Sequence, residues 1–247
     1  VLFVTPGDFK SLKLIKTLKF EAIKISSGLC TNIPLIKEAA KLNLPMILST
    51  GMAYESEIIE AIKTVKKNSK KGVGVLKCTS IYPASFDTLN LNAIKEFKKK
   101  FKVPIGYSDH SLGIQACLSA VSLGAKIIEK HFTLNKKNKG ADHKISLEPK
   151  EFSEMVKNIR DIEKMLGNSS IVPTKKEISL RSVFHRYLVA KKDILRGERI
   201  SLSSIGIKRL FKYKKGALEP KFLNTIKGKI AKKNIYSDQQ LSLKKVK

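Results

Sequence analysis

Six short apolar runs rich in β-branched residues recur along the first 132 residues and limit the folds that the chain can adopt. They begin 21 to 30 residues apart and span Val1–Thr5, Ala22–Ser26, Pro45–Thr50, Val73–Thr79, Val103–Asp109 and Ala125–Phe132. Between them, apolar residues recur at helical spacing, as at Ile58, Ile62 and Val65. Continuously apolar strands are typical of a parallel sheet covered by helices. The pattern therefore predicts six consecutive βα units.

Each predicted strand ends in polar residues, among them Lys24, Ser49, Ser108 and His131. In a (β/α)8 barrel all strand ends meet at one mouth, where active sites lie. In an open doubly wound sheet, only the ends near the switch point would meet. Polar ends on all six strands favour the barrel. We therefore expect an α/β fold of the TIM (β/α)8 type that lacks its first two βα units in this chain, which begins with Val1 rather than Met.

The region after the barrel pattern has a different character. A long predicted helix, Pro149–Leu166, is followed by a polar stretch, and the remainder holds short β-prone pieces and five of the six arginines. We predict a barrel domain over residues 1–167, a linker over 168–180 and a small α+β domain over 181–247.

The net charge of +28 suggests a polyanion partner, but its distribution does not. Only six of the 49 basic residues are arginine, the lysines are scattered along every predicted helix, and aromatic residues make up 7% of the chain. A single-stranded nucleic acid site would need a basic groove interleaved with aromatic side chains. A proteome that favours lysine is therefore the preferred explanation of the net charge, and a nucleic acid partner is not expected.

The composition also bears on location. No run approaches the roughly 18 apolar residues of a membrane span, and no secretory signal opens the chain. The three cysteines, Cys30, Cys78 and Cys117, form no CxxC pair. We expect a cytoplasmic protein with reduced thiols and no membrane partner.

Hydroxyl groups and flexible backbone gather at three predicted strand ends, in Ser27-Gly28, in Ser49-Thr50-Gly51 and at Ser108, with Lys24 nearby. These groups donate hydrogen bonds and offset negative charge, as a bound phosphate or carboxylate requires. At a single strand end, Ser, Thr and Gly would more simply cap the next helix. Three such ends meeting at one mouth favour an anion site.

His110 and His131 end two successive predicted strands and so are expected to lie close together. Two imidazoles without a thiolate leave positions open to water and substrate oxygen, which suits Mn²⁺ or Mg²⁺ as a Lewis acid better than a closed Zn²⁺ site. A single histidine would more often be a structural hydrogen-bonding residue. Cys78 has no evident base partner, and no GxSxG or HExxH motif occurs, so hydrolysis through a nucleophile is not expected.

Six motifs occur in order along the chain: KISSG (24–28), ILSTGM (47–52), CTSIYP (78–83), GYSDH (106–110), IEKHFT (128–133) and DHKISLEP (142–149). Together they closely resemble the sialic acid synthase family, over strands three to eight of that family's barrel. The region that includes 189–198 and 207–209 looks like the family's antifreeze-like (SAF) domain. The resemblance implies an enzyme that condenses phosphoenolpyruvate with N-acetylmannosamine or a related N-acylated hexose. The implied products are a nonulosonic acid and phosphate, formed by C–O cleavage with Mn²⁺.

The resemblance also implies roles for individual residues. The positions that match the binding site for the phosphate and carboxylate of phosphoenolpyruvate are Lys24, Ser27, Ser49 and Ser108, with Thr5 and Ser80 as further candidates. His110 and His131 match the metal ligands, and with Lys24 they are the expected catalytic residues. Tyr82 and Asp142 match residues that hold the amino sugar. Arg209 matches an arginine that the SAF domain inserts into the partner subunit's active site, which implies a domain-swapped homodimer.

The chain departs from the family pattern at several places. Leu29 stands where an acidic residue is usual, Gly7 where an aromatic residue is usual, and 210–213 where a Pro-Gly turn is usual. The first two βα units, with a catalytic glutamate and a second phosphate-binding lysine, are missing from the sequence. We therefore expect this chain to behave as a fragment that is poorly stable and inactive by itself. Two alternatives remain: a legionaminic or pseudaminic acid synthase, and an inactive binding protein of the same family.

Overall fold

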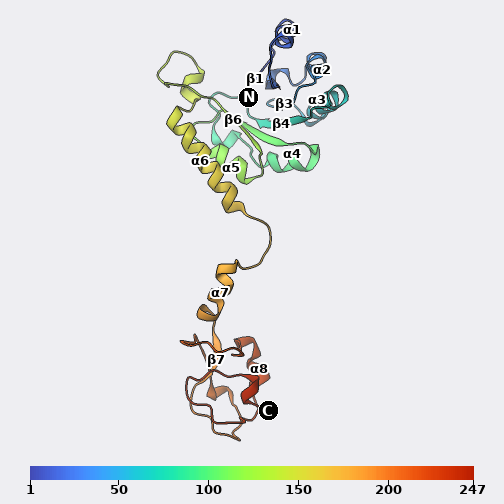
Figure 1. Cartoon of the computed structure of the whole chain (residues 1–247). Coiled ribbons are helices and arrows are strands. Elements are labelled where there is room, and N and C mark those ends of the chain that lie inside the picture. Colours follow the sequence, from blue (N-terminus) through green and yellow to red (C-terminus); the bar gives the residue numbers. More distant parts are fainter. The chain divides into compact units, whose positions relative to one another are not determined.

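The computed structural model describes residues 1–247, which divide into two compact units, Val1–Asn168 and Ser169–Lys247. The first unit is built on one parallel sheet in which each strand pairs with the next in the sequence (Figure 1). Its strands are β1 (Phe3–Val4), β2 (Ala22–Ile25), β3 (Met46–Ser49), β4 (Val73–Cys78), β5 (Ile105–Asp109) and β6 (Ile127–Lys130). This open six-stranded sheet confirms the six predicted βα units. Its two edge strands are β1 and β6.

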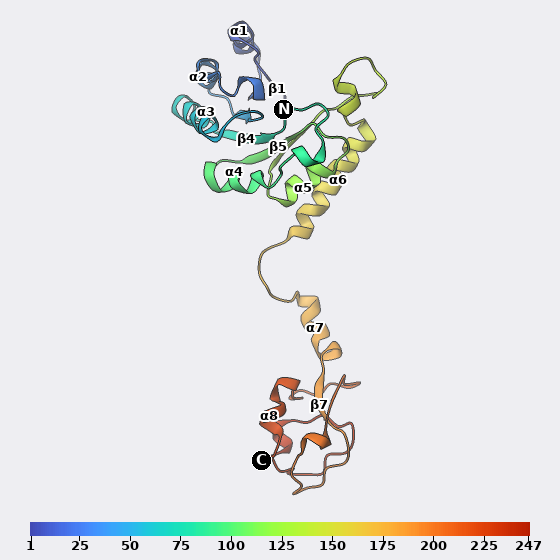
Figure 2. The same ribbon diagram turned by 180° about the vertical axis from the view of Figure 1, so that it is seen from behind.

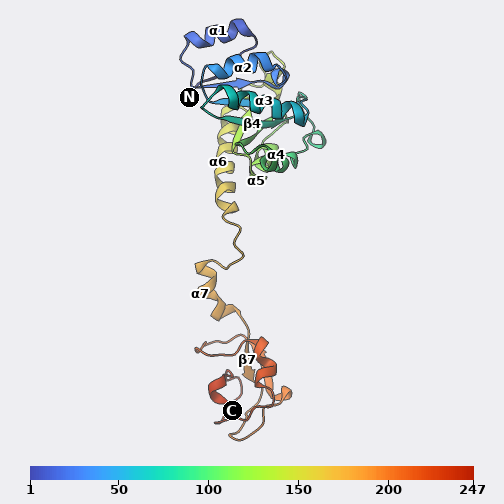
Figure 3. The same ribbon diagram turned by 90° about the vertical axis from the view of Figure 1, so that its right-hand side faces the viewer.

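A helix follows each strand, and α1 to α4 succeed one another along one side of the sheet (Figure 3). The helices of this unit are α1 (Phe9–Thr17), α2 (Ile33–Lys41), α3 (Glu55–Asn68), α4 (Ala93–Phe101), α5 (Gln115–Ser122) and α6 (Pro149–Leu166). Their apolar residues lie on one stripe, as Ile58, Ile62 and Val65 do on α3, and pack on buried strand residues such as Ile25 and Val75. The main core therefore lies between the sheet and its outer helices.

Local capping sets where these helices begin. Asp8 precedes α1, and its carboxylate accepts a hydrogen bond from the backbone N–H of Ser11 at 2.7 Å. At α6, Pro149 occupies the first turn, where the missing N–H has no cost. This last helix has the bounds expected from the sequence and packs along α5 (Figures 1 and 2), with Cys117 and Met155 buried between the two.

The second unit begins with a helix, α7 (Lys175–Phe184), that buries none of its residues. The latter part of the predicted linker is thus helical. Next come β7 (Tyr187–Ala190), its antiparallel partner β8 (Ile205–Lys208), and the short helix α8 (Leu223–Ile226). A separate small core holds the unit together, and its fully buried members include Leu188, Ala190, Ile194, Ile226, Ile235 and Leu241. No helix of the chain is both long and apolar enough to cross a membrane.

Candidate active site

A cavity of about 380 Å³ lies at the carboxyl ends of β2 to β5. Its lining residues are Lys24, Ser26, Ser27, Gly28, Ser49, Met52, Cys78, Ser80, Tyr82, Ser108 and His110. The parallel sheet brings these side chains together because all of its strands run in the same direction and end at the same edge. Most of the residues singled out in the sequence therefore meet in one place.

Ser49, the last residue of β3, places a buried hydroxyl without a hydrogen-bond partner in the cavity. The residue is 1% exposed, and its hydroxyl is the only buried side-chain oxygen or nitrogen in residues 1–247 without a hydrogen-bond partner. A buried hydroxyl left unpaired costs about 1–3 kcal/mol. A ligand in the cavity would supply the missing partner, and an anion would accept the hydroxyl proton.

Lys24 and Ser108 share one acceptor on β6. The Lys24 ammonium lies 3.1 Å from a carboxylate oxygen of Glu129, and the Ser108 hydroxyl donates to the same oxygen at 2.8 Å. These contacts hold the only cationic side chain of the cavity lining, other than a protonated imidazole, at the end of β2. Glu129 was not among the sequence candidates, although it stands in the IEKHFT motif.

Gly51 has no side chain, and this leaves space for two of the cavity hydroxyls. Its backbone N–H donates to the Ser27 hydroxyl at 3.0 Å. A Cβ at this position would lie 2.1 Å from the Ser80 hydroxyl and 2.9 Å from that of Ser27. Only glycine therefore allows both hydroxyls to point into the same space.

His110 and His131 face each other across the ends of β5 and β6, with ring centroids 5.2 Å apart. Nδ1 of His110 lies 2.8 Å from the carbonyl oxygen of Thr79. Because a carbonyl oxygen only accepts, Nδ1 carries the proton, and Nε2 of the neutral ring keeps its lone pair for a ligand. The Tyr82 ring lies 4.0 Å from the His110 ring and 6.0 Å from the His131 ring, measured between centroids.

The two imidazoles differ in their electrostatic surroundings. Burial lowers the pKa of His131 and the neighbouring His110 lowers it further, against the charges of Asp142 and Glu129. Burial alone would also lower the pKa of His110, but hydrogen bonds to Cys78 and the Thr79 carbonyl raise it overall. A metal ion that binds here has to displace any proton from Nε2 of His110.

The donor set fits a divalent metal that takes its remaining ligands from water and substrate. Two facing imidazoles are present, one of them with its tautomer fixed by a backbone carbonyl, as is usual for metal-binding histidines. No group of three or more His, Cys, Asp or Glu side chains in residues 1–247 could enclose an ion. The pair therefore fits an open site for Mn²⁺ or Mg²⁺ and not a closed structural one.

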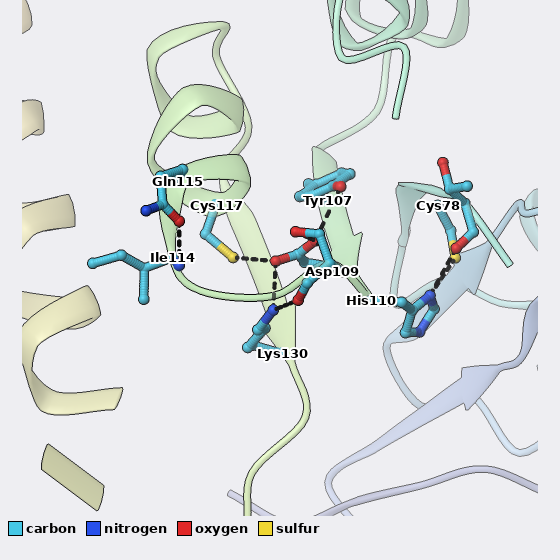
Figure 4. Close-up of polar contacts among 10 residues, drawn as sticks. Cys78, Tyr107, Asp109, His110, Ile114, Gln115, Cys117 and Lys130 are labelled. Carbon is cyan, nitrogen blue, oxygen red and sulfur yellow. Dashed lines mark hydrogen bonds and ion pairs between the residues drawn. The ribbon is translucent and has the colours of Figure 1, made fainter. Parts of the chain in front are cut away.

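Cys78 has a partner that the sequence did not reveal. Its sulfur lies 3.7 Å from Nδ1 of His110 (Figure 4). Burial alone would raise the pKa of the thiol, but hydrogen bonds with His110, Ser27 and Ser108 lower it overall. Because His110 Nδ1 already bonds the Thr79 carbonyl, this pair adds a polar contact to the cavity wall and leaves Nε2 untouched.

Behind the two histidines lies a buried ion pair that sequence reasoning did not single out. The Lys130 ammonium lies 2.7 Å from a carboxylate oxygen of Asp109, and both side chains are 0% exposed (Figure 4). The period of two along a strand could have revealed it, because Asp109 and Lys130 each precede a histidine and so point to the opposite face.

Four residues from the sequence analysis are not part of the cavity lining, and the first of them, His131, lies beside it with its ring centroid 5.2 Å from that of His110. Thr5 is exposed and does not line it. Asp142 lies 3.6 Å from Nδ1 of His131, and its side chain is 67% exposed. Arg209 belongs to the second unit, where its Nε donates to the carbonyl oxygen of Val183 and its guanidinium lies 4.8 Å from the centre of the Phe184 ring.

Comparison with known proteins gives this arrangement a family. Residues 1–171 match the NeuB family, and residues 185–247 match the SAF domain. The chain belongs to the NeuB family. This confirms the resemblance drawn from the six motifs and the barrel-plus-SAF organisation that it implied.

Curated relatives of this NeuB-family chain carry nonulosonic acid names. It is 44% identical over 237 residues to the N,N'-diacetyllegionaminic acid synthase of Campylobacter jejuni, covering 95% of this chain and 70% of that protein. It is 37% identical over 234 residues to the pseudaminic acid synthase of the same species, covering 94% of this chain and 66% of that protein. The chain spans between 57% and 70% of the length of the curated relatives that it matches.

A solved structure supports the fold. The N-acetylneuraminic acid synthetase of Leptospira borgpetersenii, crystallised in complex with citrate, superimposes with a TM-score of 0.68 at 42% identity. The match covers 73% of this chain and 64% of that one. The six-stranded parallel sheet is therefore part of a barrel of the same type.

Proposed function

We propose that this NeuB-family protein condenses phosphoenolpyruvate with an N-acylated hexose to give a nonulosonic acid and phosphate. The observation that carries the proposal is the buried, unpartnered Ser49 hydroxyl in a cavity beside two facing imidazoles. A small anion that accepts from Ser49 would lie within the same mouth as a metal ion. Phosphoenolpyruvate carries two anionic groups and fits the hydroxyls and the lysine of this cavity.

In this proposal the cavity residues bind phosphoenolpyruvate, and the histidine pair would hold the metal ion that activates the sugar aldehyde. Lys24, Ser27, Ser49 and Ser108 surround the phosphate and carboxylate, and the unpartnered Ser49 hydroxyl donates to one of them, with Ser80 close to Ser27. Tyr82 and Asp142, which lie beside the two histidines, hold the amino sugar. His110 and His131 would hold Mn²⁺ or Mg²⁺ through imidazole nitrogen. When bound, the ion supplies Lewis acidity to the aldehyde of the open-chain sugar.

The reaction that follows forms one C–C bond and breaks one C–O bond. C3 of phosphoenolpyruvate attacks the sugar aldehyde carbon, and the aldehyde oxygen takes up a proton. Water adds to the cationic C2, loses a proton, and gives a tetrahedral intermediate that expels phosphate with its bridging oxygen. Lys24 and the serine hydroxyls face the negative charge of the phosphate throughout, and such preorganised donors stabilise charge most strongly where water is excluded.

The test of this proposal uses phosphoenolpyruvate labelled with ¹⁸O in the bridging position. It is run with Mn²⁺ on the 247-residue chain and on the protein extended upstream to its nearest start codon, hereafter the extended protein. N-acetylmannosamine and diacetylated hexoses are supplied in turn, because the relatives' names include more than one nonulosonic acid. The proposal expects labelled phosphate with one of these sugars, and the sugar that supports it identifies the product.

Two histidine variants complete the test. His131→Ala is expected to reduce labelled phosphate release to background, because one of the two metal ligands is lost. His185→Ala, which changes a histidine of the second unit, is expected to behave as wild type. Unchanged turnover in His131→Ala would contradict the metal assignment. No labelled phosphate from the extended protein with any of the sugars would favour a binding protein that has lost catalysis.

We also propose that the active protein is a homodimer in which Arg209 enters the partner's site. Arg209 is exposed in the second unit, and its contacts there are with a backbone carbonyl and an aromatic ring, so no carboxylate holds it. Mixed dimers of the extended protein test this: Arg209→Ala and His131→Ala are each expected to be inactive. If the site is shared, random mixing leaves about a quarter of the sites intact and restores about a quarter of the activity. No recovery on mixing would contradict the swap.

The cysteines support a reducing compartment for this reaction. Cys30, Cys78 and Cys117 are all unpaired, as is typical of proteins in the cytoplasm. Burial raises the pKa of Cys30 to about 11, and burial likewise raises the pKa of Cys117, so neither thiol reacts readily.

A further inference from the structure

We propose that the buried Asp109–Lys130 ion pair is a positioning device that sets the spacing of His110 and His131 for a shared metal ion. The inference rests on the proposed function, because it assumes that the two imidazoles bind a metal. Neither Asp109 nor Lys130 touches the cavity, so both act through the histidines that follow them in the chain.

The strand pairing places the ion pair directly behind the histidines. Asp109 and Lys130 are register partners at the last paired position of β5 and β6. Successive residues of a strand point to opposite faces, so the residues after them, His110 and His131, turn toward the mouth. The ion pair therefore fixes the distance between the two chain segments at the point where they leave β5 and β6.

Hydrogen bonds tie the backbone on both sides of His110 to this pair. One carboxylate oxygen of Asp109 accepts from the Ser111 backbone N–H at 3.0 Å and from the Ser111 hydroxyl at 2.8 Å. The Lys130 ammonium also donates to the Ser111 carbonyl oxygen. His110 thus lies between two residues that are both held by the network, and its backbone has little freedom to move.

The remaining lone pairs of Asp109 are used as well. The Tyr107 hydroxyl donates to the carboxylate at 3.2 Å, and the Cys117 thiol of α5 donates to its other oxygen at 3.4 Å (Figure 4). The network therefore links β5, β6 and α5. His131 follows Lys130 directly, and its own carbonyl accepts from the Leu147 N–H at 2.8 Å.

Stability alone does not account for an ion pair at this position. Burying two charges is costly, and apolar residues of similar volume often replace such a pair without loss of stability. What apolar residues cannot reproduce is a fixed distance between two atoms on neighbouring strands. Loss of a group that hydrogen-bonds a metal-binding imidazole typically weakens metal binding about 10- to 100-fold, and we expect an effect of the same order when the backbone that carries the imidazoles loses its support.

The experiment separates positioning from stability by comparing two variants of the extended protein. Lys130→Met leaves the Asp109 carboxylate buried and unpaired, so we expect it to lower the melting temperature and weaken Mn²⁺ binding. Asp109→Leu/Lys130→Met removes both charges, so we expect the melting temperature to recover while Mn²⁺ still binds about 10- to 100-fold more weakly than in wild type. Free Mn²⁺ is counted by electron paramagnetic resonance, which needs no turnover.

The matched control removes an exposed Asp–Lys pair from α6. Asp161 and Lys164 lie 3.0 Å apart, with side chains 48% and 76% exposed, and Asp161→Leu/Lys164→Met is expected to bind Mn²⁺ as wild type does. His131→Ala is expected to abolish binding, which ties the signal to this site. Wild-type affinity in a folded Asp109→Leu/Lys130→Met protein would overturn the positioning role.

Two other outcomes are also decisive. If the double variant does not fold, Asp109→Asn is measured in its place, because it keeps the side-chain volume and removes the charge. Wild-type Mn²⁺ affinity in that variant overturns the inference. If the wild-type extended protein binds no Mn²⁺, the metal assignment of the proposed function fails and the positioning role with it. Binding by wild type with no effect of either variant contradicts the positioning role alone.

Discussion

Two regions at the carboxyl end of the sheet, the cavity and the ion pair behind the histidines, satisfy their polar groups in opposite ways. At the ends of β2 to β4, the Ser49 hydroxyl is buried without a partner, and the Ser27 and Ser80 hydroxyls crowd the space above Gly51. At the ends of β5 and β6, every hydrogen-bonding atom of the Asp109 carboxylate is occupied, and Lys130 is buried against it.

This difference separates binding from positioning. An unpaired buried hydroxyl costs about 1–3 kcal/mol, and such a group is expected where a ligand completes the hydrogen bonding. A saturated buried network resists movement and holds the residues attached to it. The first region therefore needs a ligand to complete its hydrogen bonding, whereas the hydrogen bonding of the second is complete within the protein.

The largest effect is expected from the one lysine of the binding region. Lys24→Met should weaken phosphoenolpyruvate binding about 10- to 100-fold, because hydrogen bonds to charged groups contribute about 1.5–3 kcal/mol. Titration calorimetry measures the change. The control is Lys100→Met, which removes an exposed lysine paired with Glu55 outside the cavity. Equal affinities for Lys24→Met and wild type would remove the lysine from the anion site.

A smaller effect is expected from crowding the cavity. Gly51→Ala places a Cβ against the Ser80 and Ser27 hydroxyls and should weaken phosphoenolpyruvate binding about fivefold or more, since overpacking costs about 1–3 kcal/mol. Gly28→Ala is the matched control: Gly28 also lines the cavity, but a Cβ there meets nothing within 4 Å. If the two variants bind equally well, the space above Gly51 is not where the ligand lies.

The smallest effect is expected at Ser49, where a substitution should maintain or raise stability but weaken binding. Ser49→Ala removes an unpaired buried hydroxyl, so the free energy of unfolding should stay constant or rise by about 1 kcal/mol, while phosphoenolpyruvate binds about 2- to 10-fold more weakly. Chemical denaturation and calorimetry measure the two quantities.

A second buried serine sharpens this comparison. Ser204 of the second unit is 1% exposed, and its hydroxyl donates to the Ser201 carbonyl oxygen at 2.8 Å and accepts from the Ser201 N–H. Ser204→Ala should therefore lower stability and leave binding unchanged. A Ser49→Ala protein that is destabilised like Ser204→Ala would show that Ser49 has a partner within the protein.

The sequence predicted the binding region better than the positioning region. Continuous apolar runs locate β2 to β6 within two residues, because runs of consecutive apolar residues are typical of strands in a parallel sheet. Lys24 and Ser49 could be singled out because polar residues are conspicuous at the ends of apolar strands. Their convergence then follows from the common direction of parallel strands.

The positioning region depends on partners that sequence distance conceals. Asp109 and Lys130 are separated by 21 residues, and their pairing follows from the register of β5 and β6, which apolar patterning does not set to one residue. The contact between Cys78 and His110 likewise joins neighbouring strands, and the same imidazole nitrogen also bonds the carbonyl oxygen of Thr79. Neither contact leaves a local motif.

The central claim is that the anion cavity and the histidine pair form one site. Phosphorus-31 electron–nuclear double resonance on a frozen sample of the protein with Mn²⁺ and phosphoenolpyruvate tests it most directly. We expect a ³¹P coupling to Mn²⁺ that disappears in His131→Ala. Mn²⁺ and phosphoenolpyruvate that both bind to the protein without any ³¹P coupling would contradict it.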